Sequence, residues 1–162
     1  MASRVSAASQ FAVYGPTFLD VVMGPLDGPP VPGREAWVEG ALMCAGGAAN
    51  QAIALARLGS PVRLHSRVGV DQMGQFVDKM LAREGVDTSS CERVGDQNVT
   101  VSLSFDGDRA MTTRGTTVLP RLGGDAPACL LADVRGIGGN TEIVSSWREH
   151  GTWVLADTAW DE

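Results

Sequence analysis

The sequence has few of the features that mark several large classes of protein. Its 162 residues include three cysteines, Cys44, Cys91 and Cys129, an odd number with no CxxC pair. This usage favours reduced thiols in a cytoplasm over a disulfide framework or a zinc site. No apolar run approaches membrane-spanning length. Residues 1–10 are polar and small, without the apolar core of a signal peptide, which predicts an unstructured start rather than a targeting segment. We expect a cytoplasmic protein without a membrane partner.

Basic residues and known nucleotide-binding motifs are also scarce. Lysine and arginine together number 13 against 19 acidic residues, so the net charge is −6, and no basic cluster offsets it. This balance argues against a nucleic-acid partner. The glycine-rich segment 136–139 is neither a P-loop nor GxGxxG, and it is interpreted as a plain strand–helix connection. His65 and His150 are far apart and lack metal-ligand spacing. We expect no metal site.

What the chain does have is the length, composition and patterning of one α/β domain. Its hydrophobic fraction of 44% is ordinary for a globular protein. Apolar runs predict strands at 11–15, 62–68, 128–132 and 153–157. Helices are predicted in the segment that ends at Gly59, in the segment that follows Asp71, and over 141–150. Alternation of strands with helices is typical of an α/β fold.

The stretch from Ala45 to Ala52 is the centre of the functional prediction. Gly46 and Gly47 stand where a chain can turn tightly and let a ligand approach the backbone, and an alanine-rich helix follows them. The first N–H groups of a helix have no partner within it, so they suit hydroxyl or anionic oxygens. Asn50, in the first turn, offers both a donor and an acceptor. The alternative is a tight strand–helix turn that serves only close packing.

One set of residues is spaced as in the first sequence signature of a known enzyme family. The set is Gly46, Gly47, Asn50, Ala52, Gly59 and Gly69. The pattern resembles that of the ribokinase-like (PfkB) carbohydrate kinases, and segments 68–74 and 81–87 are also similar to that family. The resemblance covers nearly the whole chain and implies an incomplete three-layer α/β/α core with a small β-sheet lid. We expect residues 1–162 to form a partial ribokinase-like domain, with lid segments at approximately 17–44 and 96–118.

Asp20 lies just past the first predicted strand, where open α/β sheets bind ligands. From the residues alone it could equally be a turn or cap aspartate. The resemblance implies that it grips sugar hydroxyls, and a carboxylate can accept two such hydrogen bonds from a diol. The predicted substrate-binding residues are therefore Asp20, Gly46, Gly47 and Asn50, and the partner is a small sugar or polyol.

Two further segments are assigned to the lid. Residues 35–44, including Trp37, form an imperfect strand pattern, and 98–105 alternate apolar with polar side chains before the hairpin signal Asp106-Gly107. The polar face of 98–105 suits either a solvated sheet, which is the default, or a lid that faces a polar ligand. Arg109 and Arg114 on the return strand are interpreted as surface charges. The resemblance also implies a homodimer through the lid sheet.

The resemblance implies ATP and Mg²⁺ for the complete enzyme, but neither has a recognisable site here. The family's second signature, a Gly-Ala-Gly-Asp segment that supplies the base and an anion hole, does not occur in the sequence. Asp157 and Asp161 lie outside any such glycine context, so no catalytic residue is assigned. We expect the N-terminal half of a sugar kinase, inactive alone.

Two alternatives remain open at this stage. One is a non-catalytic remnant that binds sugar or dimerises. The other is a dinucleotide-binding domain, although the segment from Gly46 to Asn50 lacks the glycine spacing that such a domain requires. Neither the sugar or nucleoside nor the oligomeric state follows from these residues.

Overall fold

The computed structural model describes residues 11–105 and 107–158. Its centre is a parallel sheet in the order β10-β9-β1-β4, formed by Trp153–Asp157, Cys129–Asp133, Phe11–Tyr14 and Val62–His65. Side chains of β1 alternate between two faces. Val13 packs into one buried cluster with Val62 and Leu64, while Ala12 and Tyr14 pack into another.

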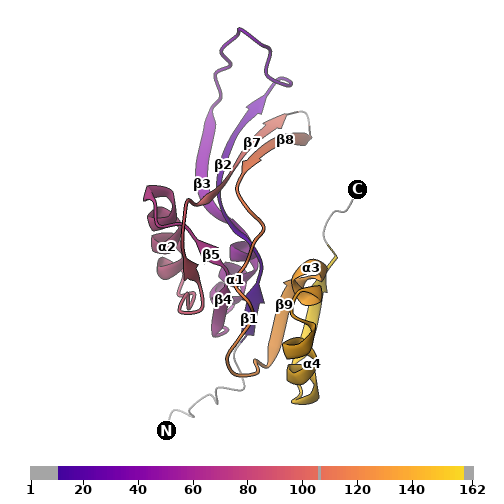
Figure 1. The fold of residues 1–162 in the computed structure, drawn as a ribbon. Helices are drawn as coiled ribbons and strands as arrows, with labels where there is room; N and C mark the ends of the chain where they lie inside the picture. The colour runs from indigo at the N-terminus through magenta and orange to yellow at the C-terminus, as the bar shows by residue number, and fades with distance from the viewer. Residues whose placement is uncertain (1–10, 106, 159–162) are drawn as a thin grey trace.

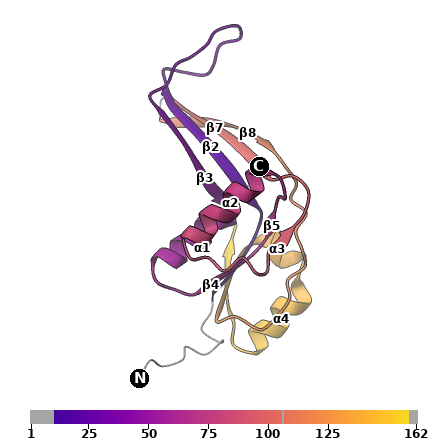
Figure 2. The same ribbon diagram turned by 90° about the vertical axis from the view of Figure 1, so that its left-hand side faces the viewer.

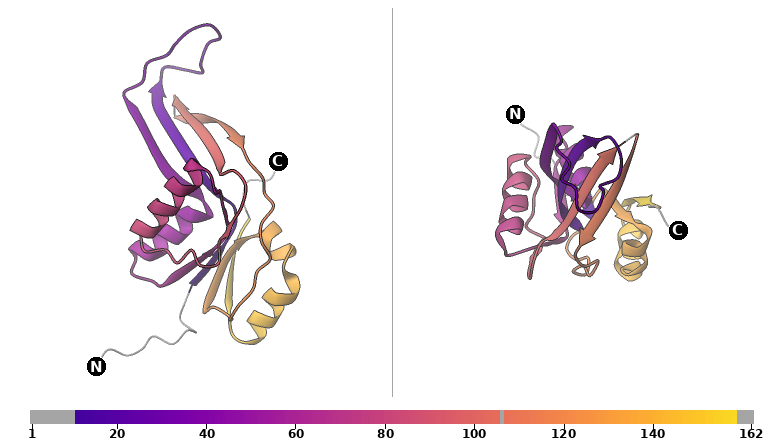
Figure 3. Two further views of the ribbon diagram at one scale, coloured as in Figure 1. Left: turned by 60° about the vertical axis from the view of Figure 1, so that its left-hand side comes forward. Right: turned by 90° about the horizontal axis from the view of Figure 1, so that it is seen from above.

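Helices cover both faces of this sheet and complete three layers (Figures 1 and 3). The helices α1, Ala48–Arg57, and α2, Gln72–Arg83, share the first cluster, and α4, Thr141–Glu149, contributes Val144 and Trp147 to the second. A short helix α3, Val134–Gly138, precedes α4. The predicted α/β class with a three-layer α/β/α core is confirmed.

A second sheet projects beyond the carboxyl ends of the parallel strands (Figure 2). Its order is β3-β2-β7-β8, with bounds Gly40–Gly47, Thr17–Leu26, Asn98–Phe105 and Asp108–Arg114. The β2–β7 pairing is parallel and the other two pairings are antiparallel. We call these four strands the projecting sheet. A minor pair, β5 (Arg67–Val68) and β6 (Glu92–Arg93), lies beside α2.

Local sequence explains where the helices begin and end. The Asp71 carboxylate accepts a hydrogen bond from the Gly74 N–H at 2.8 Å and caps α2, as predicted. Gly59 and Gly85 follow α1 and α2 with φ of 78° and 75°, a conformation that costs glycine least. Asn140 precedes α4 as predicted, but its side chain does not cap the helix. It instead accepts from the Leu122 N–H at 2.9 Å.

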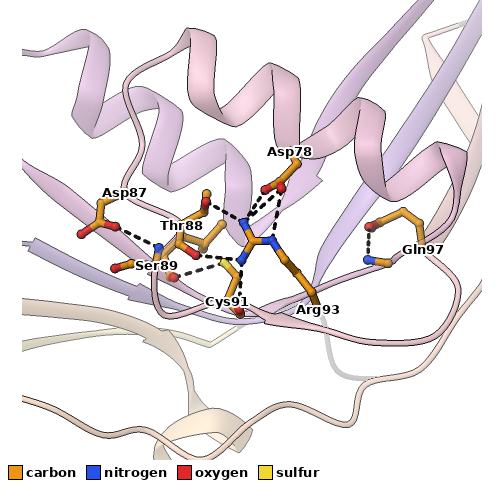
Figure 4. A network of polar contacts seen from close by, with 9 residues as sticks. Asp78, Asp87, Thr88, Ser89, Cys91, Arg93 and Gln97 are labelled. Carbon is orange, nitrogen blue, oxygen red and sulfur yellow. Dashed lines mark hydrogen bonds and ion pairs between the residues drawn. The ribbon is translucent and has the colours of Figure 1, made fainter.

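One polar network ties α2 to the segment that follows it (Figure 4). The Arg93 guanidinium donates to both carboxylate oxygens of Asp78, at 2.7 and 3.0 Å, and to the Thr88 hydroxyl at 2.9 Å. The groups are largely solvent-exposed, so this network fixes geometry more than it adds stability.

The structure corrects several element predictions. The strand expected over 35–44 begins at Gly40 and continues to Gly47, and Trp37 is 87% exposed in the preceding loop. The strand expected over 62–68 is interrupted at Ser66. In the amphipathic helix after Asp71, Val77 and Leu81 are buried, whereas Met73 and Phe76 are 45% and 38% exposed because α2 has only one face on the protein.

Other features stand as follows. The connection expected over 136–139 is partly the short helix α3. The predictions for residues 1–10 and for Asp106 and Asp161 lie outside the described residues. Within the described ranges, no helix is both long enough and apolar enough to cross a membrane.

Candidate functional site

The topology points to one edge of the parallel sheet. Strand β1 has β4 on one side and β9 on the other, and the chain visits β4 before it crosses to β9. The crevice outside the carboxyl ends of β1 and β9 is therefore a topological switch point, where open α/β sheets bind ligands. The projecting sheet begins there, because β2 follows β1 after only Gly15 and Pro16.

Asp20 follows β1, as predicted, but it lies within the next strand, β2, rather than in a turn or at a helix cap. It is paired with Cys44 of β3 and with Thr100 of β7. Burial raises the pKa of the Asp20 carboxyl, while a hydrogen bond from Thr100 and the charge of Arg109 act in the opposite direction. A half-buried carboxylate in the middle of a sheet is costly unless its lone pairs are used.

Gly46 and Gly47 are required for two different reasons. A Cβ at residue 46 would overlap the carboxylate of Asp20, so the absence of a side chain makes room for that group. Gly47 has φ of 64°, and a Cβ there would overlap the Pro16 carbonyl oxygen. That carbonyl accepts a hydrogen bond from the first N–H of α1, Ala48, at 2.9 Å. The glycine pair thus joins β3 to α1 against the start of β2.

Asn50 lies in the first turn of α1 and is exposed. Its neighbour Gln51 donates a hydrogen bond through Nε2 to Oδ2 of Asp157, at 3.2 Å. Asp157 is the last residue of β10, as the sequence predicted. The start of α1 therefore borders the carboxyl end of the parallel sheet. The structure brings Asp20 and Gly46 together and places Asn50 one helical turn from Gly47.

A buried polar network missed by sequence reasoning supports the base of the projecting sheet. Gln97 is 1% exposed, donates to the Thr17 carbonyl at 2.9 Å and accepts from the Gly69 N–H at 2.9 Å. The Thr17 and Ser66 hydroxyls lie 2.8 Å apart, and Ser66 donates to the Gly15 carbonyl at 2.7 Å. These bonds fix the start of β2, at Thr17, to the segments that follow β4. Asp20 is only three residues further along the same strand. No local periodicity marks them, because their partners are distant in sequence.

The polar face of β7 is also different from expectation. Asn98, Thr100 and Ser102 are 4%, 9% and 8% exposed, whereas Val101 on the opposite face is 38% exposed. The default interpretation as a solvated surface is therefore wrong. Asn98 exchanges two hydrogen bonds with the backbone of Thr116, at 3.0 and 2.9 Å, which satisfies its buried amide.

A cavity of about 290 Å³ opens at the switch point itself. Its lining includes Tyr14 and Pro16 at the end of β1, Asp133 and Arg135 at the end of β9, and Thr117 and Asn140. A larger and more open groove, of about 680 Å³, lies between α4 and β10. Neither cavity is lined by any of the predicted site residues Asp20, Gly46, Gly47 and Asn50. Within the described ranges, no group of three or more His, Cys, Asp or Glu side chains could hold a metal ion.

Comparisons with known proteins agree with this geometry. Residues 38–117 match the family model described as pfkB family carbohydrate kinase. The chain is 40% identical over 75 residues to a fructokinase from Vibrio alginolyticus, and 46% identical over 56 residues to a 2-dehydro-3-deoxygluconokinase from Bacillus subtilis. These alignments cover 44% and 35% of the chain, but only 24% and 17% of the two relatives.

The fold is similar to that of a solved Arabidopsis thaliana ribokinase, complexed with ribose and ATP, with a TM-score of 0.73 at 20% identity. That match covers 95% of this chain and 55% of the ribokinase chain. The chain thus spans about half the length of the solved structure and matches its fold over nearly all its own residues.

Proposed function

We propose that the chain belongs to the pfkB family of carbohydrate kinases, whose family model matches residues 38–117, and that it carries the substrate-binding part of an ATP-dependent kinase acting on a sugar or polyol hydroxyl. One observation supports this most directly. The Asp20 carboxylate lies over Gly46, two residues before α1 begins, on the sheet that leaves the parallel strands near their topological switch point.

Each predicted site residue has a part in this proposal. Asp20 accepts hydrogen bonds from two hydroxyls of the substrate and so fixes its orientation. Gly46 leaves space for that carboxylate, and Gly47 lets β3 turn into α1 close to the ligand. Asn50 offers an amide donor and acceptor to a further hydroxyl. Holding the acceptor hydroxyl in one orientation is a large part of what a phosphoryl-transfer enzyme must do.

We further propose that the projecting sheet, within segments of approximately 17–44 and 96–118, is a lid over the sugar. Its side chains on the Asp20 face are mainly polar near Asp20 and apolar further along, where Leu42 and Met111 are 55% and 57% exposed. This apolar end favours a second candidate role, a homodimer formed through the projecting sheet. A sugar-binding or dimerising remnant without catalysis is consistent with the same features.

The residues present do not fit a site for ATP or Mg²⁺. The sequence contains no Gly-Ala-Gly-Asp segment, and the described residues hold no acidic or histidine cluster suited to a metal. We therefore assign no nucleotide contact and no catalytic base to this chain. We propose that these 162 residues alone bind the acceptor but do not transfer phosphate.

The test is equilibrium binding by calorimetry with D-fructose, D-ribose and 2-dehydro-3-deoxygluconate, with and without Mg-ATP. We expect at least one sugar to bind, and Asp20→Asn to weaken it about tenfold, the loss of a charge-assisted hydrogen bond. Asp27 is exposed in the loop after β2, so Asp27→Asn is the matched control and should bind sugar as tightly as the wild type does. Equal sugar binding by the wild type and Asp20→Asn would contradict the proposed role of Asp20 in binding the substrate hydroxyls. ATP turnover with sugar would contradict the inactivity.

A further inference from the structure

The projecting sheet joins the rest of the protein at a buried glutamine. Its two central strands, β2 and β7, begin side by side, with Phe18 of β2 paired to Asn98 of β7. Gln97 is the residue just before β7, and its side chain is 1% exposed. This one side chain therefore lies where both central strands of the sheet begin.

Both ends of the Gln97 amide are used, and they contact different segments. Nε2 donates to the Thr17 carbonyl at 2.9 Å and to the Asn98 carbonyl at 3.3 Å, at the first residues of β2 and β7. Oε1 accepts from the Gly69 N–H at 2.9 Å, in the segment between β5 and α2. Because an amide donates from one atom and accepts at the other, one side chain ties both strands to the core. We call these bonds the Gln97 lock.

The backbone of Gln97 is held just as closely. A Cβ at residue 69 would lie 2.3 Å from the Gln97 nitrogen, so the two backbones touch at Gly69. The Gln97 N–H also donates to Oδ2 of Asp71 at 3.3 Å, while Oδ1 of Asp71 caps α2. Tilting the projecting sheet about this point would separate the Gln97 amide from the Thr17 carbonyl and the Gly69 N–H. Buried polar groups left without partners cost more free energy than their hydrogen bonds contribute.

We infer that Gln97 is a positioning residue for the sugar site, because the Gln97 lock holds the projecting sheet at one orientation relative to the parallel sheet. The inference rests on the proposed function and deepens it. Thr17 is paired with Gly47 of β3 and lies three residues before Asp20 on β2. Asp20 thus belongs to the projecting sheet, whereas Asn50 lies on α1, which packs on the parallel sheet. A sugar that contacts both is bound tightly only when the two parts keep a fixed angle.

Gln97 acts on the sugar site without contacting the ligand. Its side chain is buried, and both amide atoms are already occupied within the protein. Its replacement therefore changes sugar binding through the orientation of the projecting sheet. When only a fraction of the molecules holds the competent orientation, the apparent dissociation constant rises in inverse proportion to that fraction. Replacement of Asp20, in contrast, removes a contact with the sugar itself.

The first experiment measures this orientation by backbone amide residual dipolar couplings of the isotope-labelled full chain, without sugar. In the wild type we expect one alignment tensor to fit β1, β4 and β9 together with β2 and β7. Gln97→Met keeps a side chain of similar length but removes the amide bonds. The projecting sheet of this variant should need a separate tensor of smaller magnitude, the signature of motion relative to the core. Two tensors in the wild type, or one common tensor in Gln97→Met, would overturn the Gln97 lock.

Val144→Ala is the control for a loss of stability alone. Val144 is 5% exposed on α4, in the buried cluster on the other face of the parallel sheet, and its truncation leaves a cavity there. One tensor should still fit both sheets in this variant. A separate tensor in Val144→Ala as well would mean that any loss of stability loosens the projecting sheet, and would overturn the role of Gln97.

Hydrogen exchange in the wild type tests the Gln97 lock even if Gln97→Met does not fold. The Gly69 N–H donates to the buried Gln97 amide, so it should exchange as slowly as the amides of β1. Gly123 is exposed in a loop and provides the fast reference. Exchange at Gly69 as fast as at Gly123 would overturn the lock.

The second experiment measures the affinity of wild type and Gln97→Met for D-fructose, D-ribose and 2-dehydro-3-deoxygluconate by calorimetry. We expect Gln97→Met to weaken every sugar that binds by a similar factor, about fivefold, because the sheet's orientation and not a contact is lost. Val144→Ala should bind as tightly as the wild type. Wild-type affinity in a Gln97→Met variant whose sheet is loosened would overturn the positioning role and leave the proposed function standing. If the wild type binds no sugar, the proposed function and the positioning role fail together, while the couplings still decide the lock.

Discussion

The carboxylate of Asp20 lies over the backbone of Gly46, in the space that a Cβ at residue 46 would fill. The two residues are not direct partners in the β2–β3 pairing, since Asp20 is opposite Cys44 and Gly46 is opposite Phe18. The Asp20 side chain therefore reaches along the sheet toward the start of α1. A glycine is required at position 46 because the Asp20 carboxylate occupies the space of a side chain there. At position 47 it is required because the backbone has a φ of 64°.

The first prediction follows from that relationship. In Gly46→Ala the new methyl group displaces the Asp20 carboxylate, so we expect sugar binding to fall at least tenfold while far-UV circular dichroism stays near that of wild type. Unfolding free energy should drop by about 1–3 kcal/mol, the usual range for overpacking. Gly123→Ala, where a Cβ meets nothing within 4 Å, is the control and should change neither quantity. Full binding by Gly46→Ala would refute the assigned contact.

The second prediction uses Cys44 as a reporter of the Asp20 charge. Burial and, to a smaller degree, the Asp20 carboxylate raise the pKa of the Cys44 thiol. Asp20→Asn removes that charge, so more thiolate forms and alkylation by iodoacetamide at pH 8 should be about two- to threefold faster at Cys44. Peptide mass spectrometry measures each cysteine separately.

Cys91 and Cys129 are internal controls in the same molecules. Both are buried, and burial raises the pKa of Cys91 to about 12, so their rates should be slow and equal in both proteins. A rate at Cys44 that Asp20→Asn does not change would place the carboxylate away from the thiol, against the β2–β3 register.

Much of the fold could be predicted from local patterns, whereas the site's support could not. The helix cap at Asp71, the glycines after α1 and α2, and the strand at 98–105 are local signals, and the structure confirms them. The choice of which face of β7 is buried depends on other segments. Asn98 is buried because the backbone at Thr116 satisfies its amide, and alternation alone assigned the polar face to solvent.

The position of Asp20 shows the same limit. Gly15 and Pro16 correctly end the first strand, but the chain immediately begins β2, so a residue expected just past a strand lies inside the next one. Its neighbours Cys44, Thr100 and Thr113 come from three other places in the sequence. The family resemblance predicted Asp20 as a site residue, and this stays a prediction. The hydrogen-bonded threonines gave no signal in the sequence.

The third prediction concerns stability between pH 7.5 and 5.5. His65 is 7% exposed, and burial is the main reason that its pKa is lowered from its usual 6.5. The unfolded chain therefore binds a proton that the folded chain resists, so stability is full above pH 6.5 and declines as the pH falls toward the folded-state pKa. We expect wild type to lose about 1 kcal/mol across this range in urea unfolding.

His65→Phe keeps a ring of similar size and should remove this pH dependence, even if its stability differs at pH 7.5. His150, exposed after α4, is the chain's other histidine, and His150→Gln should retain the decline. A decline that persists in His65→Phe and disappears in His150→Gln would contradict this prediction and assign the effect to His150.

The fourth prediction concerns acid. The Asp87 carboxylate accepts from the Arg63 guanidinium at 2.7 Å and from the Ser89 N–H at 2.9 Å. Burial opposes ionisation, but these hydrogen bonds hold the pKa of Asp87 to about 2, below its usual 3.8. Its stabilising effect is present above pH 3.8 and is lost as the pH falls toward 2. With its partial exposure considered, Asp87→Asn should cost about 1 kcal/mol at pH 7.

The pH dependence separates this interaction from a general loss of packing. The difference between wild type and Asp87→Asn should shrink between pH 4 and pH 2, measured by urea unfolding, because protonation removes the same charge from the wild type. Asp27→Asn, in the exposed loop after β2, should match wild type throughout. A difference that stays constant down to pH 2 would mean that the carboxylate stabilises this connection by shape, and that its charge on Arg63 contributes nothing.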